Sequence, residues 1–185
     1  IAAIEAAGGT AAADSSDIST DAGAKALIDH ALADFDRLDV LVNNAGILRD
    51  RVLVTMSEAE WDAVIAVHLK GTFGPSRHAA LYWREQSKSG APVDARIINT
   101  TSASGVFGNV GQSNYGAAKA GIAAFTIITA MELDRYGVTV NAVAPRALTS
   151  MTETLPRYQQ IAAEPGGAER ISPDHISPVV VWLAG

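Results

Sequence analysis

Hydrophobic and polar positions along the chain follow two alternating patterns. Short runs rich in β-branched residues predict strands, and these runs lie at Asp39–Asn43, Arg96–Thr100 and Val138–Val143. Longer stretches in which apolar residues recur every three or four positions predict helices from Thr20 to Phe35, from Ser57 to about Trp83 and from Ser113 to about Arg135. Strands that alternate with covering helices are typical of the α/β class. We therefore predict a doubly wound parallel sheet with helices on both faces, a three-layer αβα arrangement.

Capping and turn residues mark where several of these elements begin and end. Ser57-Glu58-Ala59-Glu60 forms a capping box at the start of one helix, and Thr20 is a suitable cap for an earlier one. Gly137 is expected to end the helix that precedes the third strand. We further expect a surface loop at Ser87–Pro92 and a short buried helix at Pro178–Leu183.

Composition and charge narrow the classes of function. The 185 residues are 48% apolar, which is enough for one domain with a substantial core. The 14 Lys and Arg residues are scattered among 20 Asp and Glu residues, so we expect no nucleic-acid partner. No apolar run approaches the roughly 18 residues of a membrane span, so no membrane partner is expected. The absence of cysteine fits a reducing compartment, and we expect a cytoplasmic protein.

Three side chains near the second predicted strand have the chemistry of an active site. In an open parallel sheet, ligands bind outside the carboxyl ends of the strands, and Ser102 follows such an end. Tyr115 and Lys119 are four residues apart and therefore share one face of the next helix. An ammonium one turn away is expected to lower the pKa of the Tyr115 phenol, which is near 10 in water. On spacing alone, a surface pair on an amphipathic helix is the simpler interpretation, so the surrounding sequence decides.

That surrounding sequence resembles the short-chain dehydrogenase/reductase family. The resemblance rests on three motifs in the family's order and spacing, which are Asn43-Asn44-Ala45-Gly46, Ile97–Gly105 and Asn114–Gly121. It covers about Ala11 to Leu183 and implies a Rossmann-type fold. It also implies that Tyr115 is the catalytic acid/base, that Ser102 polarises the carbonyl or carbinol, and that Lys119 holds the nicotinamide ribose.

The same resemblance implies a path for the nicotinamide cofactor. Asp17 and Ile18, expected at the end of an early strand, would lie beside the adenine; an Asp that caps a turn is the alternative. Asn44, Ala45 and Gly46 would pass close to the ribose, and a plain turn after a strand is the alternative there. The nicotinamide would be covered by the segment after the last predicted strand, which comprises Pro145, Arg146, Ala147, Leu148 and Thr149.

Two positions depart from the family's usual pattern. His68 stands where many relatives have an Asn that supports a water in a proton relay with the lysine, so His68 is a candidate catalytic residue. It could act through its ring or through its backbone carbonyl, or it could simply fill a helix position. Arg146 stands where relatives usually have Gly, and either contact with an anionic group or solvated surface fits it. The other histidines lack metal-ligand spacing, so no metal is expected.

Some motifs indicate one branch of the family. Gly46–Arg51, Val67–Gly71, Thr101–Gly105, Met151–Thr154 and Pro178–Leu183 are similar to the (3R)-hydroxyacyl-CoA dehydrogenase domain of the peroxisomal multifunctional enzyme and to its bacterial relatives. The resemblance implies hydride transfer between a nicotinamide cofactor and a secondary alcohol on a 3-hydroxyacyl-CoA or steroid-like lipid. It implies NAD as the cofactor, with NADP left open, and a homo-oligomer (dimer or tetramer) formed through the long helices. A 3-oxoacyl carrier-protein reductase is the nearest enzymatic alternative.

A function of another class stays open because one part of the expected pattern is missing. A dinucleotide fold normally begins with a strand, a Gly-rich turn and a helix whose N-terminus receives the pyrophosphate, and Gly8-Gly9 lacks that context. The chain also begins with Ile1 and not with Met. We therefore expect residues 1–185 to form a single incomplete domain without its first βαβ unit and its C-terminal end. A catalytically inactive interaction module is the alternative to an enzyme.

Overall fold

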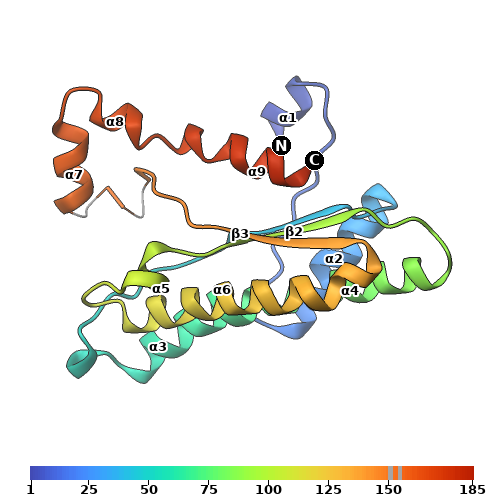
Figure 1. Cartoon of the computed structure of the whole chain (residues 1–185), viewed down its shortest axis with the longest axis horizontal. Helices are drawn as coiled ribbons and strands as arrows, with labels where there is room; N and C mark the ends of the chain where they lie inside the picture. The colour runs from blue at the N-terminus through green and yellow to red at the C-terminus, as the bar shows by residue number, and fades with distance from the viewer. Residues whose placement is uncertain (150–151, 154–155) are drawn as a thin grey trace.

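A three-stranded parallel sheet lies at the centre of the computed structural model, which describes residues 1–149, 152–153 and 156–185 (Figure 1). The strands are β1 (Val40–Asn43), β2 (Ala95–Thr100) and β3 (Val138–Val143), and β2 lies between the other two. The register pairs Val40 with Arg96 and Ala95 with Val138. Because all three strands are parallel, their carboxyl ends lie at the same edge of the sheet. The predicted parallel α/β class is confirmed.

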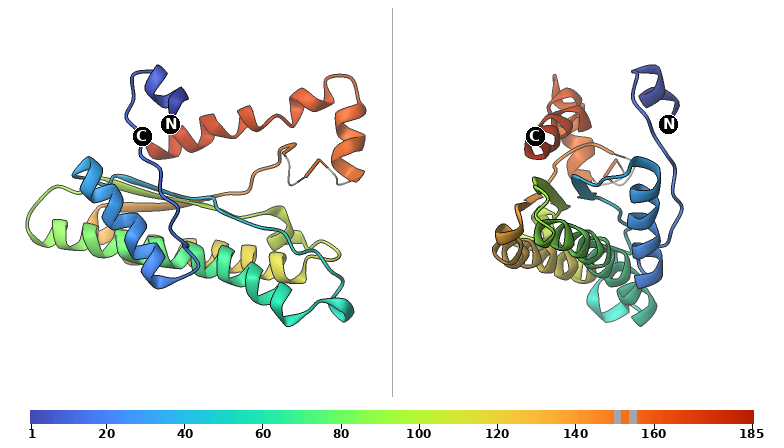
Figure 2. Two further views of the ribbon diagram at one scale, coloured as in Figure 1. Left: turned by 180° about the vertical axis from the view of Figure 1, so that it is seen from behind. Right: turned by 90° about the vertical axis from the view of Figure 1, so that its right-hand side faces the viewer.

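Helices lie on both sides of this sheet (Figure 1, Figure 2). One side carries α3 (Glu58–Ile65), α4 (Gly71–Lys88) and α6 (Ser113–Leu133), with α2 (Asp21–Phe35) packed against α4. The other side carries α1 (Ala2–Ala6), α7 (Pro156–Ala163), α8 (Gly167–Arg170) and α9 (Ser177–Ala184). The short α5 (Ala103–Phe107) leads from β2 to α6, and 3₁₀ turns occur at Leu53–Thr55, Asp134–Tyr136 and Pro173–His175.

The hydrophobic core lies between the sheet and the helices α2 and α4. Ile97 of β2 is fully buried, and Trp83 of α4 and Ile28 of α2 pack into the same cluster. The Trp83 indole N–H donates to the carbonyl oxygen of Leu38 at 2.6 Å, so its polar atom has a partner. Burying side chains of this size contributes roughly 1.5–3 kcal/mol each, which fixes the helices against the sheet.

The second predicted helix is longer and less regular than expected. It begins at the predicted capping box, where Ser57 and Glu60 exchange both hydrogen bonds. A π-helical turn at Ala66–Lys70 then separates α3 from α4, and α4 continues to Lys88. Ser87, which we predicted in a loop, is therefore helical. Turns of this kind occur frequently at functional sites, and this one contains the candidate catalytic histidine.

The early strand predicted to end at Asp17 is absent, which corrects the prediction. Residues 9–16 run past α2 as an extended segment with no paired strand among the described residues (Figure 2). A strand forms backbone hydrogen bonds with a neighbouring strand. This segment is instead attached to α2, where the Asp14 carboxylate bonds to His30 at 2.7 Å. The Asp17 carboxylate accepts from the backbone N–H of Ser19 at 3.0 Å and from its hydroxyl at 2.7 Å. The alternative that we considered, a turn cap before α2, describes its position.

Two apolar elements are less buried than predicted. The helix α9 forms where the sequence predicts it, but Val181 and Trp182 are 69% and 78% exposed. Because α9 is apolar all round and packs on the sheet mainly at β2, several of its apolar side chains stay exposed. Strand β1 pairs only with β2, so Val42 is 44% exposed although Leu41 is buried.

The helix α6 is more apolar than we expected from the sequence, in which no uninterrupted apolar run reaches the length of a membrane span. With the turn that follows it, Ser113–Tyr136 is long and apolar enough to cross a membrane by length and composition alone. In this fold α6 packs against β3 and β2, and 28% of its most apolar window is buried. Most of its apolar surface is therefore turned away from the core.

Candidate active site

Ser102, Tyr115 and Lys119 lie together at the carboxyl end of β2. Ser102 is the N-cap of α5, where its hydroxyl oxygen accepts from the backbone N–H of Ser104 at 3.2 Å. Tyr115 and Lys119 lie one turn apart on α6, and the Lys119 Nζ is 5.6 Å from the centroid of the Tyr115 ring. The parallel sheet explains this grouping, because the residues after a strand and the first turns of the next helix share one edge.

The Lys119 side chain is held inside the protein by the strand that precedes Ser102. It is 3% exposed, and its Nζ donates to the carbonyl oxygen of Thr100 at 2.5 Å. The Thr101 hydroxyl donates to the Lys119 carbonyl oxygen at 2.7 Å. A Cβ at Gly105 would lie 2.6 Å from the Ala120 nitrogen, so only glycine allows this close packing of α5 on α6. Burial lowers the pKa of the Lys119 ammonium to about 8.

The environment of Tyr115 corrects our prediction about its acidity. We expected Lys119 to lower the pKa of the phenol, but burial raises that pKa above its ordinary value. An interaction with the Ser102 hydroxyl opposes the rise, and the charges of Asp50 and Tyr158 add to it. The prediction was wrong because it considered the nearby charge without the desolvation. At neutral pH the phenol is therefore protonated and can donate a proton.

His68 has contacts of its own within this site. It is 2% exposed in the π-helical turn, and its ring meets the Tyr115 ring edge-on with centroids 5.1 Å apart. Its Nε2 lies 2.7 Å from the carbonyl oxygen of Ile47 and 3.1 Å from the Ile47 nitrogen. Its Nδ1 is buried without a hydrogen-bond partner among the described residues. Burial lowers the pKa of the imidazole, and Lys119 lowers it further, so the ring is neutral.

Of the three roles considered for His68, these contacts favour one that uses the ring. A Cβ at Gly46 would lie 2.4 Å from the His68 Cε1, so glycine is needed where the chain crosses the imidazole. The ring thus fixes the backbone at Gly46 and Ile47 and borders the phenol of Tyr115.

The residues predicted to hold a cofactor lie in three places. Asn44, Ala45 and Gly46 are exposed directly after β1, and Asn44 Oδ1 accepts from the Thr100 hydroxyl at 3.0 Å. Ile18 packs near Gly71 at the start of α4, beyond the π-helical turn. The segment after β3 has exposed Pro145, Arg146 and Thr149, buried Ala147 and half-buried Leu148, whose N–H donates to Ile171 O at 2.7 Å. Met151 and Thr154, which contributed to the resemblance, lie outside the described residues.

The donor groups at the edge of β2 fit a nicotinamide ribose. The carbonyl oxygen of Thr100 is the one hydrogen-bond acceptor of Lys119 within the described part of the chain, and an ammonium has three donors. Two N–H donors therefore remain for ribose hydroxyls. The neutral phenol of Tyr115 and the exposed amide of Asn44 lie at the same edge of the sheet.

Sequence reasoning missed several polar side chains that hold the site together. Asn114 is fully buried; its Oδ1 accepts from the Tyr115 N–H at 2.7 Å, and its Nδ2 donates to Arg49 O at 3.0 Å. Gln112 is 5% exposed and bonds to Asp50 at 2.8 Å. The sequence feature that could have indicated them is the pair of amide side chains, Gln112 and Asn114, at the start of a mostly apolar helix.

Comparison with known proteins agrees with this geometry. The family model described as short chain dehydrogenase matches residues 1–160. The chain is 48% identical over 180 residues to a hydroxyacyl-CoA dehydrogenase, ChsB1, of Mycobacterium tuberculosis, covering 96% of this chain and 56% of that protein. It is 40% identical over 165 residues to peroxisomal multifunctional enzyme type 2 of Mus musculus, covering 89% and 20%.

A solved structure gives the same result. The crystal structure of a short chain dehydrogenase from Mycobacterium avium matches with a TM-score of 0.86 and 51% identity over 100% of this chain and 59% of that one. The chain thus spans little more than half the length of these two mycobacterial proteins. The Rossmann-type fold and the resemblance inferred from the motifs are confirmed. The chain belongs to the short chain dehydrogenase family.

Proposed function

We propose that the protein is a nicotinamide-dependent oxidoreductase that interconverts the secondary alcohol and the ketone of a 3-hydroxyacyl-CoA or a similar lipid. The observation that carries this proposal is the grouping of the Ser102 hydroxyl, the Tyr115 phenol and the buried Lys119 ammonium at the carboxyl end of β2. The name of the Mycobacterium tuberculosis relative, a hydroxyacyl-CoA dehydrogenase, supports the hydroxyacyl substrate. The resemblance favours NAD over NADP.

The side chains of the site supply the proton transfer. The cofactor, when bound, gives or accepts the hydride. In ketone reduction, the neutral phenol of Tyr115 donates its proton to the carbonyl oxygen, and the Ser102 hydroxyl stabilises the negative charge that develops on that oxygen. In alcohol oxidation the phenol must first lose its proton. Because burial raises the pKa of Tyr115, the oxidation rate is expected to increase as pH rises above neutrality.

The remaining polar groups orient these two donors. Lys119 offers its free N–H donors to the ribose, and its hydrogen bond to Thr100 keeps the ammonium beside the phenol. His68 bonds to the backbone of Ile47 and contacts the Tyr115 ring, so it connects the loop after β1 to Tyr115. We assign it a positioning role through its ring.

Substrate and cofactor preference can be measured by the absorbance of the reduced cofactor. With NAD⁺, we expect (3R)-3-hydroxybutyryl-CoA to be turned over faster than the (3S) isomer and faster than the carrier-protein thioester. We also expect (3R)-3-hydroxybutyryl-CoA to be turned over faster with NAD⁺ than with NADP⁺. Faster turnover of the carrier-protein thioester with NADPH would favour the 3-oxoacyl reductase instead. If neither NADH nor NADPH binds in a fluorescence titration, the chain by itself is not a nicotinamide-dependent enzyme and the proposal fails.

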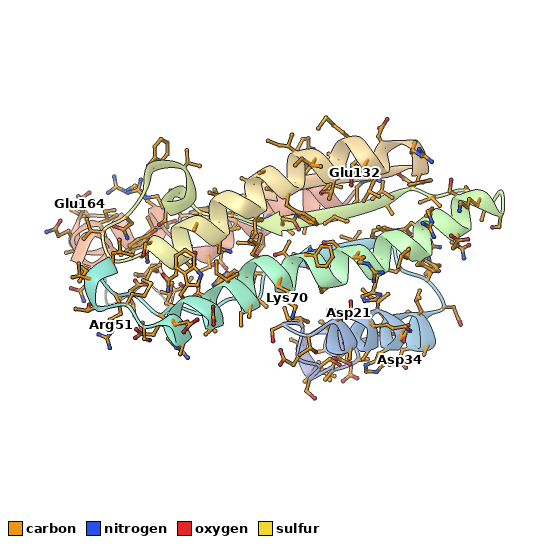
Figure 3. The ribbon with its side chains drawn as sticks, turned by 90° about the horizontal axis from the view of Figure 1, so that it is seen from below. Asp21, Asp34, Arg51, Lys70, Glu132 and Glu164 are labelled. Carbon is orange, nitrogen blue, oxygen red and sulfur yellow. The ribbon has the colours of Figure 1, made fainter. Side chains whose placement is uncertain are left out.

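We also propose that the protein forms a homodimer through α4 and α6. A groove of about 530 Å³ lies between these helices, lined by Phe73, Phe125 and Tyr136 among others, and Figure 3 views this face directly. Arg77, Arg84 and Glu132 border the same groove. A two-fold interface uses the same patch on both copies, and this patch carries both an acid and arginines that could pair across it. Sedimentation velocity should give twice the chain mass; a single-chain mass at micromolar concentration contradicts the dimer.

We further propose a cytoplasmic location. The support is that the chain contains no cysteine and so does not depend on disulfides. Fractionation of the source cells, with the chain detected by antibody, tests this location.

A further inference from the structure

A buried amide joins the loop after β1 to α5, the short helix that follows β2. Gln112 is the N-cap residue of α6 and is 5% exposed. Its Nε2 donates to the Asp50 carboxylate at 2.8 Å, in the loop after β1. Its Oε1 accepts from the hydroxyl of Ser104 in α5 at 2.9 Å and from Asn109 Nδ2 at 3.0 Å. The carboxylate can only accept and the Asn109 amide nitrogen can only donate, so these partners fix the orientation of the Gln112 amide.

The backbone on either side of this amide is fastened in the same way. The Arg51 N–H donates to the Gly111 carbonyl oxygen at 2.8 Å, and Arg51 pairs with Gln112 in an isolated parallel bridge. Asn114 bonds to the carbonyl oxygen of Arg49 at 3.0 Å. Residues 49–51 are therefore attached at successive positions to the first turn of α6. Tyr115 lies in that same turn.

The hydrogen bond from Gln112 to Asp50, called the tie below, also holds the Asp50 carboxylate near the Tyr115 phenol. The Asp50 carboxylate contributes to the raised pKa of the Tyr115 phenol. The other titratable groups around this phenol are Lys119 on its own helix, His68 in the π-helical turn and Tyr158 of α7. Within residues 1–149, 152–153 and 156–185, Asp50 has one side-chain hydrogen bond, which comes from Gln112. A change at Gln112 is therefore expected to reach Tyr115 through Asp50.

We propose that Gln112 is a positioning residue that holds Asp50 and Ser104 in place and so sets the geometry of residues 47–51 against the phenol of Tyr115. Its catalytic consequence rests on the proposed function, whereas the tie itself does not. Gln112 needs no contact with substrate for this role. A displacement of about 1 Å in such a segment can lower a rate by about 100-fold, because the reacting groups lose their alignment.

The test reverses the hydrogen bond between Gln112 and Asp50, so that the donor lies at position 50 and the acceptor at position 112. Gln112→Glu keeps an acceptor for Ser104 and Asn109 but places a carboxylate against Asp50. We expect kcat with (3R)-3-hydroxybutyryl-CoA to fall by about 10-fold or more, with KM changed less than about threefold. Adding Asp50→Asn restores a donor facing the new carboxylate, and the double variant should recover kcat to within about threefold of wild type. The matched control is Asp62→Asn, an exposed acid of α3, which should leave kcat unchanged.

Hydrogen exchange of the Arg51 amide gives a readout that does not depend on activity. We expect Gln112→Glu to speed this exchange about 10-fold and the double variant to restore it. Unchanged exchange and kcat in Gln112→Glu overturn the proposal, as does a loss in the single variant that the double variant does not recover. A loss confined to KM would make Gln112 a substrate contact and also contradict it. If the wild type turns over no substrate, the proposed function fails, and the Arg51 exchange alone decides whether the tie exists.

Discussion

The two faces of α6 partly invert the pattern of an ordinary surface helix. The inward face buries three polar residues, Asn114, Lys119 and Thr126, beside the apolar Ala118 and Ile122. The opposite face exposes Ile127 and Met131, which are 64% and 69% exposed. A typical surface helix instead buries its apolar stripe and exposes its polar residues. Both halves of this inversion therefore need a reason other than the stability of the single chain.

The buried face shows how polar groups can be kept inside this fold. Asn99 Nδ2 donates to the Thr126 hydroxyl at 2.9 Å, and Asn43 Nδ2 donates to Asn99 Oδ1 at 2.9 Å. Lys119 has the Thr100 carbonyl oxygen. Each hydrogen bond offsets the desolvation of a buried polar group, which is about 1–3 kcal/mol when no partner exists. The proposed proton chemistry at Tyr115 would account for the buried Lys119, and the proposed association of two copies would account for the exposed apolar face.

The polar side of this comparison is tested by Ser102→Ala, which is expected to lower kcat strongly because it removes a hydrogen-bond donor to the reacting oxygen of the substrate. We expect kcat to fall by about 100-fold, the size typical of losing one oxyanion donor. Cofactor binding should remain, because the proposed ribose contacts lie on Lys119. Steady-state kinetics test this, with Ser89→Ala at the exposed end of α4 as the control. A loss below about threefold would remove Ser102 from the mechanism.

Lys119→Met measures what the buried ammonium contributes to stability. Burial lowers the pKa of Lys119 from 10.5 to about 8, so the unfolded chain binds more protons between these values. The contribution of Lys119 to the free energy of unfolding therefore rises with pH across this window. Between pH 7.5 and 9.5, wild type should gain about 2 kcal/mol relative to Lys119→Met.

Urea denaturation at the two pH values makes this measurement. Lys88→Met is the control, because the side chain of Lys88 is exposed. An equal response of wild type and Lys119→Met to pH would show that the ammonium is not buried as described.

The smallest effect on stability is expected from Met131→Lys on the opposite face. A charge at this exposed position should change the free energy of unfolding of the single chain by less than about 0.5 kcal/mol. The same change should abolish the dimer, because a lysine at an apolar interface is not compensated. Sedimentation velocity and urea denaturation at low concentration separate the two results. A dimer that persists in Met131→Lys would place the interface elsewhere.

Elements that depend on local chemistry were predictable from the sequence. The hydroxyl of Thr20 caps α2, accepting the Gly23 N–H at 3.0 Å, and Ser57 opens α3 with its capping box. Gly137 has φ of 78° after α6, as its position before a strand predicted. The approach of Ser102 to Tyr115 also followed, because parallel topology fixes which strand ends share an edge.

Features that depend on distant parts of the chain were not predictable. The π-helical turn at Ala66–Lys70 adds a residue to one helical turn, and apolar periodicity does not detect a single insertion. The raised pKa of Tyr115 arises from burial, which sequence spacing does not give. The partners of Gln112 include Asp50, 62 positions earlier in the chain. The signal at that residue was only a polar side chain at a helix start, which fits a solvent-exposed cap equally well.

The central claim is that Tyr115 transfers the proton while the cofactor carries the hydride. Tyr115→Phe removes only the phenol oxygen, so the ring contact with His68, 5.1 Å between centroids, is kept. The decisive measurement compares reduced-cofactor formation from (3R)-3-hydroxybutyryl-CoA with NADH binding by fluorescence in the wild type and in Tyr115→Phe. We predict that kcat falls by at least about 100-fold while the Kd for NADH changes little. A variant that keeps near-normal kcat would contradict the account.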